Sequence, residues 1–289
     1  MKGIVLSGGA GTRLYPATKA MSKQLLPIYD KPMIYYPISV LMMAGIRDML
    51  IISSPESIDD FKQLLGSGEQ WGVQFSYLVQ NKPEGIAHAV LISKEYIGQD
   101  SFTLILGDNI FWGHGFSDIL RVAVQQKQGS SIFLYWVSKP ERYGVACIGE
   151  GNKVLDIEEK PKQPKSHWAV TGLYCYDHHA PEYAAQLKPS SRGELEITDL
   201  SRCYLQKGQL NARFMEEGIA WLDTGTHESM LQASMFVQAI QERQGLLIAS
   251  PEEIAYRLGY ISAQQLLKQA EIMKSTNYGK ILLRLVNES

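Results

Sequence analysis

Short apolar runs alternate with helical patterns over the first 140 residues. The runs Gly3–Leu6, Met49–Ser53 and Phe102–Leu106 are apolar almost throughout, which predicts strands buried on both faces. Helical patterns cover Met33–Ala44 and a segment from Pro55 to about Leu65. Strands that alternate with helices pair in parallel, because a crossover helix returns the chain easily. We therefore predict an α/β fold with a Rossmann-like, mostly parallel sheet flanked by helices. The remaining elements predicted in this part are a strand at Val73–Val79 and a helix at Ile86–Tyr96.

The pattern changes from Val145 onward. Val145–Gly149 and Lys153–Ile157 are joined through a Gly-Asn pair and predict a β-hairpin. We expect a core over residues 1–225 that consists of two halves, 1–140 and 141–225. Residues 226–289 are expected to form a helical packing or oligomer element, because Ser250…Glu253 and Ser262…Gln265 are capping-box patterns. The other elements predicted are strands Val170–Tyr176, Leu210–Met215 and Ile219–Leu222, and helices Glu196–Gln206 and Thr226–Gln244.

Composition and charge exclude several classes of protein. The 289 residues are 45% hydrophobic and 20% charged, which is typical of a globular chain with a large core. The net charge of −2 gives no basic field for nucleic acid or an anionic membrane. No segment reaches the roughly 18 apolar residues of a membrane span, and no signal peptide pattern is present. We expect a cytoplasmic protein with free cysteines.

A glycine-rich loop follows the first strand. Ser7-Gly8-Gly9-Ala10-Gly11-Thr12-Arg13 can turn tightly and point backbone N–H groups at an anion. Neither the dinucleotide fingerprint GxGxxG nor the P-loop GxxxxGK[ST] fits this loop, which counts against NAD enzymes and P-loop kinases. Arg13 closes the loop and Lys23 follows it, as expected around a polyphosphate.

These residues resemble the sugar-1-phosphate nucleotidylyltransferases, and among them the short thymidylyltransferases that use glucose 1-phosphate. The resemblance implies that dTTP and α-D-glucose 1-phosphate give dTDP-glucose and pyrophosphate with Mg²⁺, in a homotetramer. It also implies that residues 1–225 are a nucleotidyltransferase core, with a nucleotide-binding half (1–140) and a sugar-phosphate-binding half (141–225). It also suggests feedback inhibition by a dTDP-sugar such as dTDP-rhamnose at a subunit interface. The motifs that carry it are Gly8–Leu14, Lys23–Pro27, Tyr29–Pro37, Leu106–Ile110, Pro140–Val145, Glu158–Pro161, Val170–Tyr174, Arg192–Asp199 and Ala220–Thr226.

Two aspartates are assigned as metal ligands. Asp108 follows the apolar run ending at Leu106, and Asp223 ends the strand Ile219–Leu222. Carboxylates from two strand ends can hold Mg²⁺ beside a phosphate. Arg13 is expected to neutralise the leaving pyrophosphate, and Lys23 to lie near the α- and attacking phosphates. We predict Arg13, Lys23, Asp108 and Asp223 as the catalytic set.

Further roles are implied by the resemblance. Gln24 and Gln80 are expected to read the base, and Gly85 to let the backbone approach it. The segment departs from the usual pattern, because Lys82 stands in place of Ser and His88 in place of Gln. Pro161 suggests that the strand carrying Glu159 and Lys160 ends there, so that both side chains can reach the sugar phosphate. The nucleotide site is predicted to be Gly8, Gly9, Gly11, Thr12, Arg13, Lys23, Gln24, Gln80, Gly85 and Asp108, and the sugar-phosphate site Tyr143, Gly144, Glu159, Lys160, Val170, Thr171 and Arg192.

Two alternatives stay open at this point. One is a nucleotidylyltransferase that uses another nucleoside triphosphate, such as UTP, or another sugar 1-phosphate. The other is a non-catalytic protein that binds nucleotide sugars as a regulator. The presence of all four residues of the catalytic set disfavours the regulator.

Overall fold

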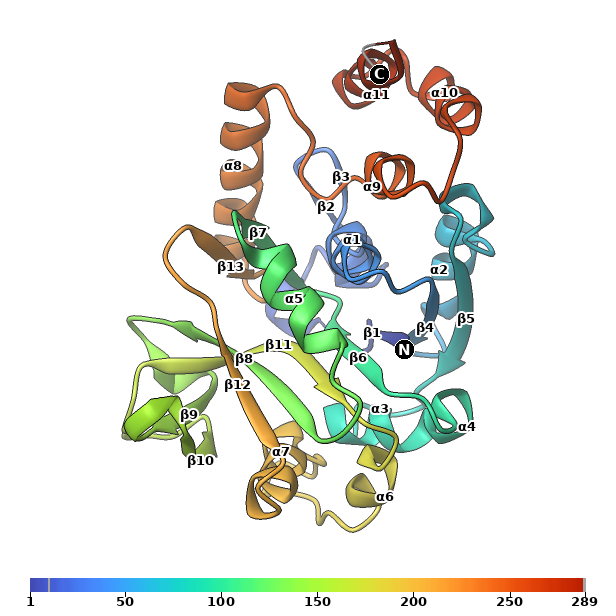
Figure 1. The fold of residues 1–289 in the computed structure, drawn as a ribbon. Helices are drawn as coiled ribbons and strands as arrows, with labels where there is room; N and C mark the ends of the chain where they lie inside the picture. Colours follow the sequence, from blue (N-terminus) through green and yellow to red (C-terminus); the bar gives the residue numbers. More distant parts are fainter. Residues whose placement is uncertain (10, 288–289) are drawn as a thin grey trace.

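A mixed nine-stranded sheet runs through the middle of the structure, a computed structural model that describes residues 1–9 and 11–287 (Figure 1). Four strands at one side are parallel, in the order β6-β1-β4-β5. Their centres are buried, as Ile4 and Ile51 are fully enclosed, which agrees with the continuous apolar runs. The predicted α/β class is confirmed. The parallel strands are β1 (Lys2–Leu6), β4 (Asp48–Ser53), β5 (Gln74–Val79) and β6 (Phe102–Leu106).

The sheet turns antiparallel beyond β6. Strand β11 pairs antiparallel with β6, β8 and β9, and β12 joins β8 in parallel. One sheet therefore runs through both predicted halves of the core. The predicted hairpin is present, with Gly151 and Asn152 in the left-handed conformation. The strands are β8 (Ser130–Trp136), β9 (Gly144–Ile148), β10 (Val154–Glu159), β11 (Trp168–Tyr176) and β12 (Leu210–Phe214).

Helices cover both faces of the sheet. Helices α1, α2 and α5 share one core with the C-terminal helices, while α3, α4, α6 and α7 share a second core on the other face. The predicted single helix Ile86–Tyr96 is wrong, because it breaks at Ser93 into α3 and α4; the Ser93 hydroxyl donates to the Ala89 carbonyl (2.7 Å), a local bond that competes with the helical ladder. The helices are α1 (Tyr35–Met43), α2 (Ile58–Leu65), α3 (Ile86–Ile92), α4 (Lys94–Ile97), α5 (Phe116–Val124), α6 (Ala180–Ala184) and α7 (Ile197–Gln206).

Two small antiparallel ladders lie outside the main sheet. Strand β7 (Asn109–Gly113) pairs with β13 (Ile219–Asp223), and β2 (Pro27–Ile28) pairs with β3 (Lys31–Pro32). The β7–β13 ladder sets Asp223 opposite Asn109. It therefore joins segments more than a hundred residues apart, at the end of β6 where Asp108 lies.

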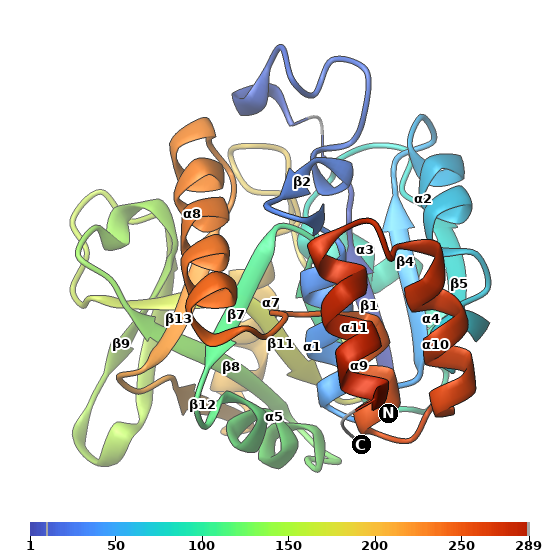
Figure 2. The ribbon, with the colours of Figure 1, turned by 90° about the horizontal axis from the view of Figure 1, so that it is seen from above.

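The C-terminal helices pack against the first half of the core, residues 1–140. Helices α9, α10 and α11 gather beside α1 and away from β9 (Figure 2). The Trp71 indole donates to Glu252 of α9 (3.2 Å), and the Glu252 carboxylate also accepts from Tyr278 of α11. No helix in the described part of the chain is long and apolar enough to cross a membrane. The helices are α8 (His227–Gln244), α9 (Pro251–Arg257), α10 (Ala263–Ile272) and α11 (Asn277–Asn287).

Candidate active site

A cleft of about 470 Å³ opens between the two halves of the core. Its walls come from the 3₁₀ turn Thr12–Leu14, the start of α3, the β6–β7 turn, β9–β11, the start of α7 and β13. The predicted residues that line it are Arg13, Asp108, Tyr143, Gly144, Glu159, Lys160, Val170, Arg192 and Asp223. The predicted residues outside its lining are Gly8, Gly9, Gly11, Thr12, Lys23, Gln24, Gln80, Gly85 and Thr171.

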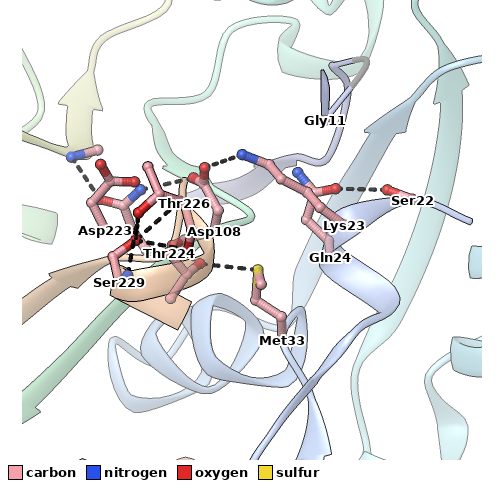
Figure 3. Close-up of polar contacts among 12 residues, drawn as sticks. Gly11, Ser22, Lys23, Gln24, Met33, Asp108, Asp223, Thr224, Thr226 and Ser229 are labelled. Carbon is pink, nitrogen blue, oxygen red and sulfur yellow. Dashed lines mark hydrogen bonds and ion pairs between the residues drawn. The ribbon is translucent and has the colours of Figure 1, made fainter. Parts of the chain in front are cut away.

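Asp108 and Asp223 converge through the β7–β13 ladder. The Thr224 backbone N–H donates to the Asp108 carbonyl (3.2 Å), and the Thr224 hydroxyl donates to the same oxygen (2.7 Å). Figure 3 shows Asp223 on one side of Asp108 and the ammonium of Lys23 pointing at Asp108 from the other. Two carboxylates and an ammonium thus meet at one point of the cleft.

The electrostatics of the two carboxylates are opposite. Burial acts to raise the pKa of Asp108, but the Lys23 ion pair and a hydrogen bond from Asn109 outweigh it, so the pKa lies below its ordinary value. Burial and the neighbouring Asp108 charge raise the pKa of Asp223. Arg13 and Arg142 partly offset that rise, with the Arg142 guanidinium 4.0 Å from the Asp223 carboxylate. The charge of Asp223 is therefore less well compensated than that of Asp108.

The donor set fits a hard divalent cation. Both carboxylates are largely buried, and the Asp108 charge adds to the effect of burial in raising the pKa of Asp223, so the two carboxylates repel each other. A cation between them would relieve this repulsion, and Mg²⁺ takes few protein ligands when phosphate oxygens and waters complete its shell. Larger groups of three or more acidic, histidine or cysteine ligands are absent from the described residues.

Asn109 connects the aspartates to the rest of the cleft. Its amide nitrogen donates to Asp108 (2.9 Å), and its amide oxygen accepts from Trp221 (2.6 Å) and from the backbone of Gly172 (3.2 Å). The side chain is almost fully buried. Each polar atom of Asn109 is used, so its orientation is determined by three different elements.

The glycine loop leaves β1 at the carboxyl edge of the parallel strands. Gly9 and Gly11 have positive φ angles (123° and 57°), which other residues rarely adopt. Arg13 follows in a 3₁₀ turn, and a Cβ on Gly225 would lie 2.9 Å from its guanidinium and 3.1 Å from the Asp223 carboxylate. The absence of a side chain at Gly225 therefore allows Arg13 to lie beside Asp223.

The residues predicted to read the base, Gln24, Gln80 and Gly85, are buried or closely packed. Gln24 is buried, and its amide oxygen accepts from the Ser22 hydroxyl (2.6 Å). The Gln80 side chain amide donates to the Gly85 carbonyl (3.2 Å). Gly85 has a φ of 107°, and a Cβ there would meet the Leu195 carbonyl at 2.3 Å, so only glycine fits.

The far wall of the cleft is a network of charged groups. Glu159 accepts from the Thr198 hydroxyl (2.6 Å) and lies 3.4 Å from Arg192, which also pairs with Glu196 (2.7 Å). Lys160 has a φ of 43°, and this left-handed turn ends the strand so that its side chain lines the same cleft as Glu159. Glu159 and Lys160 therefore line one cleft, as expected, and the binding of a sugar phosphate there stays a prediction.

Strand β11 contributes Val170, Gly172 and Tyr174 to the cleft. Val170 lines it, whereas the Thr171 hydroxyl is fully buried without a hydrogen-bond partner among the described residues. A Cβ on Gly172 would come within 2.7 Å of the Asn109 amide. The strand can approach Asn109 this closely because Gly172 has no side chain.

Sequence reasoning assigned no site role to several residues that shape the cleft. Asn109 and Thr198 hold predicted residues through hydrogen bonds, and Trp221, Tyr174 and Glu194 line the wall. Two features of the sequence could have indicated these residues. Asn109 directly follows the predicted metal ligand Asp108, and the other four residues lie within motifs that carry the family resemblance.

Comparisons with known proteins agree on one family. The chain matches the model described as nucleotidyl transferase over residues 2–240. A glucose-1-phosphate thymidylyltransferase of Xanthomonas campestris pv. campestris is 57% identical over 284 residues, which are 98% of this chain and 96% of that protein. The enzyme of the same name from Neisseria meningitidis serogroup A is 55% identical over 288 residues, covering 100% of both chains.

Two solved structures also resemble this chain in fold. A Bacillus anthracis crystal structure assigned to glucose-1-phosphate thymidylyltransferase, with sucrose bound, matches with a TM-score of 0.76 and 45% identity, covering 82% of this chain and 94% of that one. A UDP-glucose pyrophosphorylase with UDP-glucose bound matches with a TM-score of 0.73 and 27% identity, covering 84% and 98%.

Proposed function

The chain belongs to the nucleotidyl transferase family, and from that premise we propose that it is a glucose-1-phosphate thymidylyltransferase, which converts dTTP and α-D-glucose 1-phosphate into dTDP-glucose and pyrophosphate. The observation that carries the proposal is the meeting of Asp108, Asp223 and Lys23 at the cleft between the two halves of the core. Two relatives that carry this name are 57% and 55% identical over 98% and 100% of this chain, whereas the UDP-glucose pyrophosphorylase is 27% identical and covers 84% of it.

The reaction needs positioning and charge neutralisation more than a protein nucleophile. An oxygen of the sugar phosphate attacks the α-phosphorus of dTTP, and the bond from that phosphorus to the oxygen bridging to the β-phosphate breaks. The sugar phosphate is already an anionic nucleophile, so no general base is required. Pyrophosphate leaves with the bonding electrons on its oxygen.

The chain's own cations are set for the two phosphate groups. Arg13 at the rim of the cleft is placed to neutralise the leaving pyrophosphate, and Lys23 to bind near the α-phosphate once substrate competes for its ion pair with Asp108. Asp108 and Asp223 would hold Mg²⁺. When bound, this ion supplies positive charge to the phosphate oxygens.

The opposite wall is suited to a phosphorylated sugar. Glu159 offers a carboxylate to sugar hydroxyls and is itself oriented by Thr198. Lys160 and Arg192 bring positive charge to the same wall for the sugar phosphate. A homotetramer and inhibition by a dTDP-sugar remain predictions from the resemblance.

Pyrophosphate release tests the proposal. Wild-type protein with dTTP, glucose 1-phosphate and Mg²⁺ should release pyrophosphate, and Asp108→Asn and Asp223→Asn should each lower kcat by about 10²-fold or more, as losing one electrostatic group does elsewhere. Asp118→Asn is the matched control, because Asp118 is exposed and pairs with Arg121 in the same helix turn. No release with any nucleoside triphosphate would refute the proposal and favour the non-catalytic regulator.

UTP is the second candidate nucleotide. The likeness to UDP-glucose pyrophosphorylase supports it, because the two proteins share the fold at 27% identity. The same assay with dTTP, UTP, CTP and GTP separates the candidates. A kcat/KM for UTP above that for dTTP would replace dTTP by UTP as the substrate.

A further inference from the structure

The side chain of Gln80 is held in one orientation. Its amide nitrogen lies 3.2 Å from the Gly85 carbonyl and 3.0 Å from Nδ1 of His88, and the side chain is nearly buried. A carbonyl can only accept a hydrogen bond, so the nitrogen of the amide must face Gly85. Both amide hydrogens are then used within the protein. The amide oxygen is directed to the glycine loop, where it would lie 3.2 Å from a Cβ on Gly8.

His88 completes this arrangement in one tautomer. Its Nδ1 faces an amide nitrogen that can only donate, so Nδ1 must be the unprotonated, accepting nitrogen. The proton then stands on Nε2, which lies 3.1 Å from the Glu84 carboxylate. The neutral tautomer with its proton on Nε2 therefore satisfies both contacts, and Glu84 is the group that selects it.

We propose that His88 is a positioning residue that selects the nucleobase by fixing the Gln80 amide with its oxygen toward the base. The inference rests on the proposed function and on the predicted role of Gln80 in reading the base. An oxygen presented at this point accepts from a ring N–H, which thymine and uracil carry at N3. Cytosine has an unprotonated acceptor at the same position, so two acceptors would face each other and cytosine would be rejected.

The contact with His88 restricts the Gln80 amide to a single orientation. Without His88, one amide hydrogen of Gln80 loses its partner and only the Gly85 contact opposes rotation of the amide. The rotated amide would offer its nitrogen to the base and would accept cytosine. Loss of the His88 acceptor should thus weaken dTTP binding and relax discrimination together, without touching the phosphate chemistry.

Two substitutions at His88 separate positioning from packing. His88→Leu removes the acceptor, whereas His88→Asn keeps an oxygen at about the place of Nδ1. We expect His88→Leu to raise the Kd and KM for dTTP about 10-fold, to lower the dTTP-to-CTP preference about 10-fold, and to leave kcat within about twofold. His88→Asn should restore both quantities to within about twofold to threefold of wild type. His179→Leu is the matched control, because His179 also pairs with a glutamate one helical turn away (Glu182, 3.5 Å), but its ring lies beside His178 and Tyr183 and not beside Gln80.

Calorimetric binding of dTTP and CTP is measured beside turnover. If wild-type protein binds dTTP but releases no pyrophosphate, the proposed function fails while the binding preference still tests His88. If wild type is active and His88→Leu keeps its dTTP affinity and its preference, the inference is overturned on its own. An equal loss in the Leu and Asn variants also overturns it, because it would indicate a packing role.

The tautomer is observable directly. In ¹⁵N-histidine NMR, with the His88 signals assigned by their loss in His88→Asn, we expect a protonated Nε2 and an unprotonated Nδ1 at pH 8. A proton on Nδ1 would overturn the inference whatever the enzyme's substrate.

Discussion

Replacing Gly172 with alanine tests whether Asn109 is held as firmly as its three hydrogen bonds indicate. A Cβ at Gly172 would lie 2.7 Å from the Asn109 amide oxygen and 2.8 Å from its carbon and nitrogen. Asn109 can retreat only by stretching its bonds to Trp221 (2.6 Å) and Asp108 (2.9 Å). Overpacking of a rigid core costs about 1–3 kcal/mol, so we expect a loss of about 2 kcal/mol in the free energy of unfolding.

Activity should fall with stability, because the displaced amide is the one that orients Asp108. Misplacement of a catalytic group by about 1 Å can lower the rate of an enzyme about 10²-fold. We therefore expect kcat to fall at least 10-fold. Gly149→Ala is the matched control. A Cβ at Gly149 would also be crowded, at 2.9–3.0 Å, but only by the side chain of Leu155, which is 62% exposed and free to turn away. The free energy of unfolding of the Gly149→Ala variant should stay within about 0.5 kcal/mol of the wild-type value.

Urea unfolding and pyrophosphate release measure the two effects, and a double mutant identifies the cause. In an Asn109→Ala background the clashing amide is gone, so Gly172→Ala should add almost nothing to the loss that Asn109→Ala causes alone. Additive losses would refute the reasoning, as would a Gly172→Ala variant as stable and active as Gly149→Ala.

Three further outcomes are expected. Glu159→Gln should raise the KM for glucose 1-phosphate about 10-fold and leave dTTP affinity unchanged, because Glu159 lines the wall of the cleft that we propose binds the sugar phosphate; equal changes for both substrates in initial-rate kinetics would contradict this. Chelation by EDTA should abolish pyrophosphate release and added Mg²⁺ should restore it; full activity in EDTA would exclude the metal role of Asp108 and Asp223. Burial raises the pKa of Cys175 to about 11, so at pH 8 the thiol stays protonated and should resist a thiol-specific reagent such as DTNB until the protein is unfolded in guanidinium; fast reaction of the native protein, tested against Cys175→Ser, would contradict its burial.

Local patterns predicted most strands and helices because burial determines them residue by residue. Strands β1, β4 and β6 were evident from apolar runs whose residues are enclosed on both faces. The break at Ser93 was not, because it depends on a side chain that bonds to its own helix rather than on hydrophobic period. Strand β8 and helix α11 were also not predicted.

The features of the candidate site likewise divide into those that local sequence predicts and those that depend on contacts between distant segments. The expected shared orientation of Glu159 and Lys160 depended on a strand ending at Pro161, which is a local feature, and the structure confirms it. The hydrogen bonds that join Glu159 to Thr198 connect two elements distant in sequence, and no spacing along the chain encodes them.

The meeting of Asp108 and Asp223 shows why the non-local part matters most for function. Sequence reasoning placed both at strand ends, but the ladder that joins them belongs to a separate two-stranded sheet whose register sets Asp223 opposite Asn109. Because side chains alternate along a strand, a slip of one residue would turn Asp223 to the opposite face and separate the carboxylates. The two bonds from Thr224 to the Asp108 carbonyl oppose that slip. The geometry on which the metal proposal depends is therefore determined by pairing register and not by the identity of the acidic residues alone.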